Sequence, residues 1–103
     1  MLRRIDLTVR MDYSAPPQKV IEVIEAVANA HPMVLKNPKP QVLFVGFGDN
    51  SINFELRAWM DQFTDWGRTK SELTVAVYDA VQAAGMAFPL SQHEVRLLHD
   101  DKE

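Results

Sequence analysis

The chain has 103 residues, of which 47% are hydrophobic, and this length and composition predict a single packed domain. It contains no cysteine, which excludes disulfide bonds, thiolate catalysis and zinc sites built on cysteine. Its formal net charge of -3, from 11 basic and 14 acidic residues, argues against a nucleic-acid-binding surface, which needs clustered Lys and Arg.

A strand followed by a helix is predicted in the first third of the chain. Residues 4–11 alternate apolar with polar or charged side chains, which indicates a strand with one buried face. Residues 17–30 then repeat apolar side chains at helical spacing, and Pro17 suits a first helical turn because that turn needs no N–H donor. The His31-Pro32 pair ends the helix, since a residue before proline disfavours helical geometry. Residues 33–40 are expected to form a loop.

A hairpin is predicted in the middle of the chain. Residues 41–47 (QVLFVGF) form a short apolar run, which favours a central strand covered on both faces. Residues 48–51 (GDNS) have the composition of a turn. Residues 52–60 alternate again and give the second strand of the hairpin. The apolar run at 42–47 is far shorter than the roughly 20 residues of a membrane-spanning helix.

A second helix and a last strand are predicted in the final third. Asp65 is suited to cap the start of this helix, and Gly85 is suited to end it in a left-handed conformation. Residues 92–99 alternate once more and predict a strand. The residues expected on the core face of the second helix are Trp66, Leu73, Ala76, Val77, Ala80 and Ala84.

The element order strand-helix-strand-strand-helix-strand predicts an α+β fold. It is the order of a ferredoxin-like β-α-β-β-α-β sandwich, in which two helices cover one face of a mainly antiparallel sheet. We divide the chain into a ferredoxin-like domain, 1–91, and a C-terminal strand and tail, 92–103.

No catalytic residue, cofactor site or metal site is predicted, so the chain is not expected to be an enzyme. Gly46-Phe47-Gly48 lacks the third glycine of a dinucleotide fingerprint and the Gly-Lys-Ser/Thr of a P-loop, and it leads into a strand. His93 and His99 lie six residues apart on one predicted strand, too far to share a metal at roughly 3.3 Å per residue. The carboxylates have no catalytic partner at a recognisable spacing, which favours solvating charges.

Three large side chains are placed where a lone domain would favour polar residues. Val75 and Tyr78 lie opposite the core face of the second helix, and Trp59 lies on the polar side of its strand. Single exposed apolar residues are ordinary, so none of the three is informative alone. Together they favour a protein–protein surface, where Tyr and Trp are enriched.

The segment 46–59 (GFGDNSINFELRAW) resembles the hairpin of the C-terminal domain of the MscS family of small-conductance mechanosensitive channels, whose pattern here is G-D/A-S-S-h-N-F-x-h-R-h-W. Residues 5–13, 31–40 and 84–92 (AGMAFPLSQ) resemble further segments of that domain in the same order, so the resemblance covers nearly the whole chain. The chain departs from the family pattern at Asn50, Met86 and Ser91.

This resemblance implies a role within a larger membrane protein. The parent would be a channel gated by membrane tension, with membrane-spanning segments upstream of this chain. Copies of the domain would assemble as a heptamer into a hollow vestibule on the cytoplasmic face of the inner membrane, through which solutes reach the pore. The last strands would be released to pair between subunits. The candidate subunit interface then comprises Trp59, Val75, Tyr78, Gln92, Glu94 and Arg96.

A second function stays open on the sequence alone. Ferredoxin-like sheets also occur as stand-alone soluble regulatory domains that bind a small molecule, and fold alone does not distinguish the two. No cofactor and no nucleic acid is expected for either function. For the channel domain we expect the isolated chain to be soluble and largely monomeric, because one short strand per subunit gives few contacts against the entropic cost of association.

Overall fold

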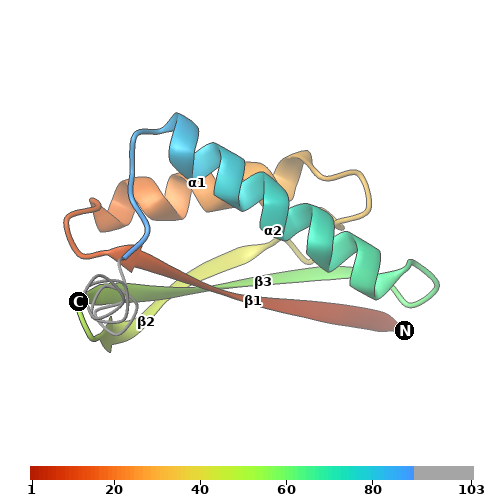
Figure 1. Cartoon of the computed structure of the whole chain (residues 1–103). Coiled ribbons are helices and arrows are strands. Elements are labelled where there is room, and N and C mark those ends of the chain that lie inside the picture. The colour runs from red at the N-terminus through yellow and green to blue at the C-terminus, as the bar shows by residue number, and fades with distance from the viewer. Residues whose placement is uncertain (90–103) are drawn as a thin grey trace, which may run out of the picture.

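Two helices cover one face of a three-stranded antiparallel sheet in the computed structural model, which describes residues 1–89 (Figure 1). This arrangement confirms the predicted α+β class, the order of the first five elements and the placement of both helices on one face. The predicted last strand and the boundary at residue 91 lie outside the described residues. The elements are β1 (Leu2–Asp12), α1 (Pro17–Ala30), β2 (Gln41–Gly48), β3 (Ser51–Asp61) and α2 (Trp66–Ala83).

The strand order is β1-β3-β2, so β3 is central and β2 lies at an edge. β3 pairs with β1 from Leu2↔Asp61 to Asp12↔Ser51, and with β2 from Gln41↔Arg57 to Gly48↔Ser51. The prediction that 41–47 is a central strand covered on both faces was therefore wrong. Its apolar run lies on an edge strand instead, where Phe47 is 83% exposed.

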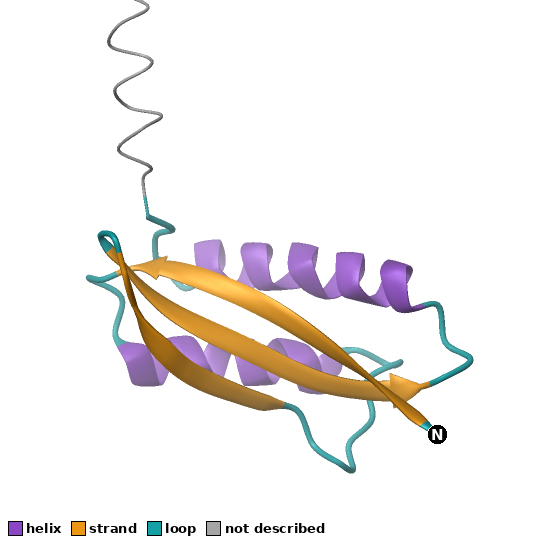
Figure 2. Cartoon of the chain, turned by 90° about the horizontal axis from the view of Figure 1, so that it is seen from below, coloured by secondary structure: helices purple, strands orange, loops and turns teal. Residues whose placement is uncertain are grey.

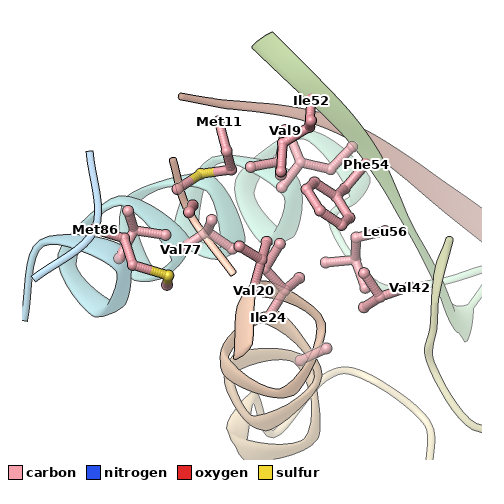
Figure 3. Close-up of a cluster of buried hydrophobic side chains, with 14 residues drawn as sticks. Val9, Met11, Val20, Ile24, Val42, Ile52, Phe54, Leu56, Val77 and Met86 are labelled. Carbon is pink, nitrogen blue, oxygen red and sulfur yellow. The ribbon is translucent and has the colours of Figure 1, made fainter. Parts of the chain in front are cut away.

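The core lies between the sheet and the helices because apolar side chains alternate along β1 and β3. Phe54 and Leu56 of β3 are fully buried against Val20 and Ile24 of α1, as Figure 3 shows. Val77 of α2 joins the same cluster. Leu73 packs in a second cluster with side chains from the other end of β1 and β3. Each helix therefore contributes one stripe to a shared core.

The ends of both helices follow from local chemistry. Pro17 is the first residue of α1, and His31 ends it, as the sequence predicts. At the start of α2, the Asp65 carboxylate accepts a hydrogen bond from the Arg68 backbone N–H at 3.1 Å. Gly85 follows α2 with φ +76°, the left-handed conformation that glycine adopts without a side-chain clash.

The core face of α2 differs in part from the prediction. Leu73 and Val77 are buried as expected, whereas Thr69 and Val81, which were not predicted, are also buried. The remaining predicted positions, Trp66, Ala76, Ala80 and Ala84, are half-buried. The buried residues follow a four-residue spacing, so the stripe is rotated slightly from the predicted one.

Candidate assembly surface

Val75 and Tyr78 point outward from α2, as the sequence predicts. They are 57% and 55% exposed. The Tyr78 ring stacks on Phe88, with ring centroids 5.5 Å apart and an angle of 9° between the planes. This contact holds the segment after α2 against the helix and presents a flat aromatic surface to solvent.

A groove lies beside this aromatic pair, between α2 and the edge strand β1. It has a volume of about 300 Å³. Among residues 1–89 no strand pairs with this edge of β1, and residues 86–88 pass only its end, where the Asp12 N–H donates to the Ala87 carbonyl at 3.1 Å. We call this feature the β1 groove; its lining residues are Leu7, Thr8, Val9, Arg10, Thr74, Val77, Tyr78 and Phe88.

Trp59 does not lie with the other two predicted residues. It is on the sheet face away from the helices, opposite Arg4 on β1, and it is half-buried. Its partial burial follows from its two neighbours, Arg4 of β1 on one side and, on the other, Leu35, whose backbone N–H donates to the Trp59 carbonyl at 2.8 Å. The structure thus brings Val75 and Tyr78 together but not Trp59. Gln92, Glu94 and Arg96 lie outside the described residues.

The face around Trp59 carries charged side chains in pairs and is not covered by a helix (Figure 2). Arg4 contacts Asp6 at 2.8 Å, and Arg57 contacts Glu55 at 2.6 Å. The hydrogen bond that Arg57 donates to the Glu55 carboxylate raises the pKa of Arg57 above its usual value. Within the described chain this face therefore has the character of a solvated charged surface.

An exposed aromatic cluster that the sequence analysis missed lies at the hairpin end of the sheet, where Phe44 and Phe47 of the edge strand β2 border one hollow with Tyr13, the residue after β1. Phe47, Tyr13 and Phe44 are 83%, 67% and 38% exposed, and the rings of Phe44 and Phe47 meet edge to face at 5.4 Å. They border a shallow hollow of about 590 Å³ that also involves Pro17 and Ile52. We call Tyr13, Phe44 and Phe47 the aromatic edge.

A β-bulge creates the aromatic edge. The pairing of β2 with β3 shifts between Phe44 and Gly46, so that Phe44 faces Phe54 and Phe47 faces Ile52. Phe54 and Ile52 point to the same face of β3, hence Phe44 and Phe47 do as well. In a regular strand, residues three apart point to opposite faces. The glycine inside an apolar run was the signal for this bulge.

His31 and Glu72 tie the end of α1 to α2. The His31 Nε2 and Glu72 Oε1 atoms are 2.8 Å apart, and Arg68 Nε donates to the other carboxylate oxygen at 3.3 Å. His31 Nδ1 accepts the Met33 backbone N–H at 3.0 Å, which places the imidazole proton of the neutral ring on Nε2. The hydrogen bond from His31, followed by that from Arg68, lowers the pKa of Glu72.

The His31→Ala variant is expected to raise the pKa of Glu72, because the bond from His31 is the largest influence that lowers it. Carboxyl-detected NMR titration measures this directly. Arg68→Ala is the matched control, with a smaller increase expected. Since the folded pKa is depressed, the carboxylate stabilises the fold above its unfolded-state pKa, and this stabilisation is lost as pH falls through the folded pKa. An unchanged Glu72 titration in His31→Ala would contradict this assignment.

Neither a metal site nor a membrane-spanning helix is found among residues 1–89. No three His, Asp or Glu side chains gather there in a way that would hold a metal ion. No helix in this part of the chain combines the length and apolar character needed to cross a bilayer.

The sequence of this chain is similar to a protein-family model and to several known proteins. The family model "Mechanosensitive ion channel MscS, C-terminal" matches residues 5–88. An uncharacterized MscS family protein of Archaeoglobus fulgidus is 34% identical over 93 residues, which are 90% of this chain and 32% of that protein. The Escherichia coli mechanosensitive channel MscK is 29% identical over 99 residues, which are 96% of this chain and 9% of MscK.

Solved structures share the fold. The closed-state crystal structure of Helicobacter pylori MscS superposes with a TM-score of 0.83 at 24% identity, over 88% of this chain and 36% of that chain. Arabidopsis thaliana MSL1 gives a TM-score of 0.75 at 8% identity, over 87% of this chain and 34% of that chain. The chain thus spans about a third of the Archaeoglobus relative and of these structures, and far less of MscK.

Proposed function

Because this chain matches the C-terminal domain of the MscS family of mechanosensitive channels and so belongs to that family, we propose that it forms part of the cytoplasmic vestibule of a tension-gated channel. Its contribution is structural: copies of the domain associate around the vestibule and leave openings through which solutes reach the pore. The observation that carries this proposal is the family match, which extends over residues 5–88 and hence over nearly all of the described fold.

The surface chemistry supports a role in assembly. The charged pairs on the open sheet face satisfy one another, and the His31–Glu72 contact joins the two helices. The His31–Glu72 pair borders a hollow of about 500 Å³, but both imidazole nitrogens and both carboxylate oxygens are already hydrogen-bonded within the fold, to Met33, to Arg68 and to each other, which is typical of a structural contact. Two exposed apolar features, the β1 groove and the aromatic edge, are instead suited to contacts with other protein surfaces.

The proposed partners are other copies of the same chain and the membrane-spanning part of the parent protein. The copies associate as a heptamer, and the membrane-spanning part holds this ring at the cytoplasmic face of the inner membrane. The membrane part raises the effective concentration of the domains, so that contacts too weak to hold isolated copies suffice in the ring. Gln92, Glu94 and Arg96 would take part in this ring through the last strand.

A chimeric channel tests the proposal. Residues 1–103 replace the corresponding C-terminal domain of a bacterial MscS relative, and the chimera is produced in cells that lack their own mechanosensitive channels. We expect the cells to survive a sudden drop in osmolarity and membrane patches to show tension-gated currents. A matched chimera carrying Phe54→Ala should lose both, because a fully buried side chain of the central strand is removed.

Either of two results would overturn the proposal. One is a chimera that is produced and reaches the membrane but carries no tension-gated current. The other is a small metabolite that raises the melting temperature of the isolated chain, which would favour a regulatory ligand-binding domain.

A further inference from the structure

We propose that neighbouring copies of this chain contact each other head to tail, with the aromatic edge of one copy docked at the β1 groove of the next. This inference rests on the proposed function and names the residues that make the contact. The occupant of the groove is thus a second copy of the chain, and the anchoring side chains are Phe44 and Phe47.

The groove and the two anchoring side chains, Phe44 and Phe47, lie on opposite edges of the same sheet. The strand order is β1-β3-β2, and the groove borders β1 whereas the aromatic edge is carried mainly by β2. A contact between two different surfaces of the same molecule builds a ring when the rotation between copies closes on itself, whereas a two-fold dimer joins a surface to itself. This placement therefore favours a cyclic assembly.

The two features also lie at the same level along the strands. Val9 of β1 faces Phe54 of β3, which faces Phe44 of β2. In the next row of paired residues across the sheet, Met11 faces Ile52, and Ile52 faces Phe47. All four side chains lie on the helix side of the sheet, where Val9 and Met11 are buried and Phe44 and Phe47 are exposed at the β2 edge. A rotation about an axis roughly parallel to the strands thus brings the aromatic edge of one copy to the groove of its neighbour.

Strand direction agrees with such a rotation. β1 and β2 each run antiparallel to β3, so they run parallel to each other. All copies then point the same way, and the described chain of every copy ends at the same end of the ring, beside the hairpin (Figure 1). Pro89, the last described residue, follows Phe88 at the groove.

Charge complementarity supports the same pairing. Arg10 lines the β1 groove, and Asp49 follows the aromatic edge by two residues on the hairpin turn. Both are exposed, and neither forms an ion pair with another residue of the 1–89 segment. Docking Phe47 at the groove brings opposite charges toward each other at the rim of the contact, which favours this register over others.

Photo-crosslinking from position 47 tests the contact and preserves an aromatic side chain there. Phe47 is replaced with p-benzoyl-phenylalanine in the 103-residue chain, and labelled and unlabelled copies are mixed at high concentration before irradiation. We expect intermolecular crosslinks that mass spectrometry maps to the segments around Leu7–Arg10 and Thr74–Tyr78. The matched control places the same side chain at Phe63, an 88% exposed phenylalanine at the other end of the sheet.

Three outcomes overturn the inference: equal yields from positions 47 and 63, crosslinks only within one chain, or crosslinks to position 47 of the other copy, which indicate a two-fold dimer. The same probe in the chimeric channel separates this inference from the proposed function. An active chimera without crosslinks to the groove refutes the contact alone. Crosslinks together with an inactive chimera refute the channel function alone.

A charge exchange gives a second measurement. Arg10→Glu and Asp49→Arg are each expected to lower the crosslink yield by about two- to five-fold, the range for a single exposed ion pair. The double variant places Glu on the groove and Arg on the facing hairpin, and should recover the yield. If the losses of crosslink yield in the two single variants instead add up in the double variant, the two residues do not face each other between copies.

Discussion

Replacing Phe54 with alanine is expected to lower the free energy of unfolding by about 3–5 kcal/mol, the range for truncating a buried phenylalanine. Phe54 is fully buried on the central strand, and its ring lies 4.9 Å from that of Phe44. Because both neighbouring strands and α1 surround it, the structure has little freedom to collapse into the cavity. Leu56→Ala on the same face should cost about 2–5 kcal/mol for the same reason.

Urea unfolding followed by circular dichroism measures both losses. Thr8→Ala is the control, since Thr8 is exposed on the opposite face of the sheet, and its effect should stay below about 1 kcal/mol. A loss below about 1 kcal/mol for Phe54→Ala would mean that the two faces of β3 are exchanged. A shift of one residue in register moves every side chain to the other face of a strand.

Local patterns predict β1, α1 and β3 well because each has one buried face. In β1 the apolar residues Ile5, Leu7, Val9 and Met11 all face the helices, as strict alternation requires. The start and end of α1 are set by Pro17 and His31-Pro32, whose restrictions act on their own backbone. Information of this kind is contained in a few neighbouring residues and needs no knowledge of the fold.

The position of β2 could not be predicted because it depends on pairing between distant strands. A short apolar run is compatible with a strand covered on both faces, and only the order β1-β3-β2 reveals that 41–48 is an edge. The bulge adds a second difficulty. It breaks the two-residue period at Phe44, so the face of Phe47 cannot be obtained by counting along the sequence.

The candidate assembly surface could likewise be predicted only in part from the sequence. Helical spacing identified Val75 and Tyr78, because a residue opposite the buried stripe of an amphipathic helix must face solvent. It could not show that Tyr78 stacks on Phe88 or borders a groove, since those contacts join α2 to the chain after it and to β1. Trp59 was placed on the correct face, but its half-burial results from contacts with residues distant in the sequence, Arg4 of β1 and Leu35 of the loop before β2.

The Gly46→Val variant is expected to lower the free energy of unfolding by about 1–3 kcal/mol, the cost of holding a residue in a sparsely populated backbone conformation. Gly46 has φ +152°, which a β-branched residue rarely adopts. An added Cβ would meet no heavy atom within 4 Å, so the penalty comes from the backbone and not from crowding. Val45→Ala, next to it and 53% exposed, is the control and should change stability by no more than about 0.5 kcal/mol.

The Gly46→Val chain can relieve this strain by giving up the bulge, and the consequence for the surface is specific. In a regular ladder continued from Phe44↔Phe54, Val45 would face Asn53 and Phe47 would face Ser51, which turns Phe47 to the open side of the sheet. Contacts between the Phe44 and Phe47 rings, visible as nuclear Overhauser effects in the natural chain, should then disappear. A variant that keeps both these contacts and its stability would show that the backbone at Gly46 is unstrained. Loss of the contacts together with retention of crosslinking from position 47 to the β1 groove would show that docking does not require the aromatic edge.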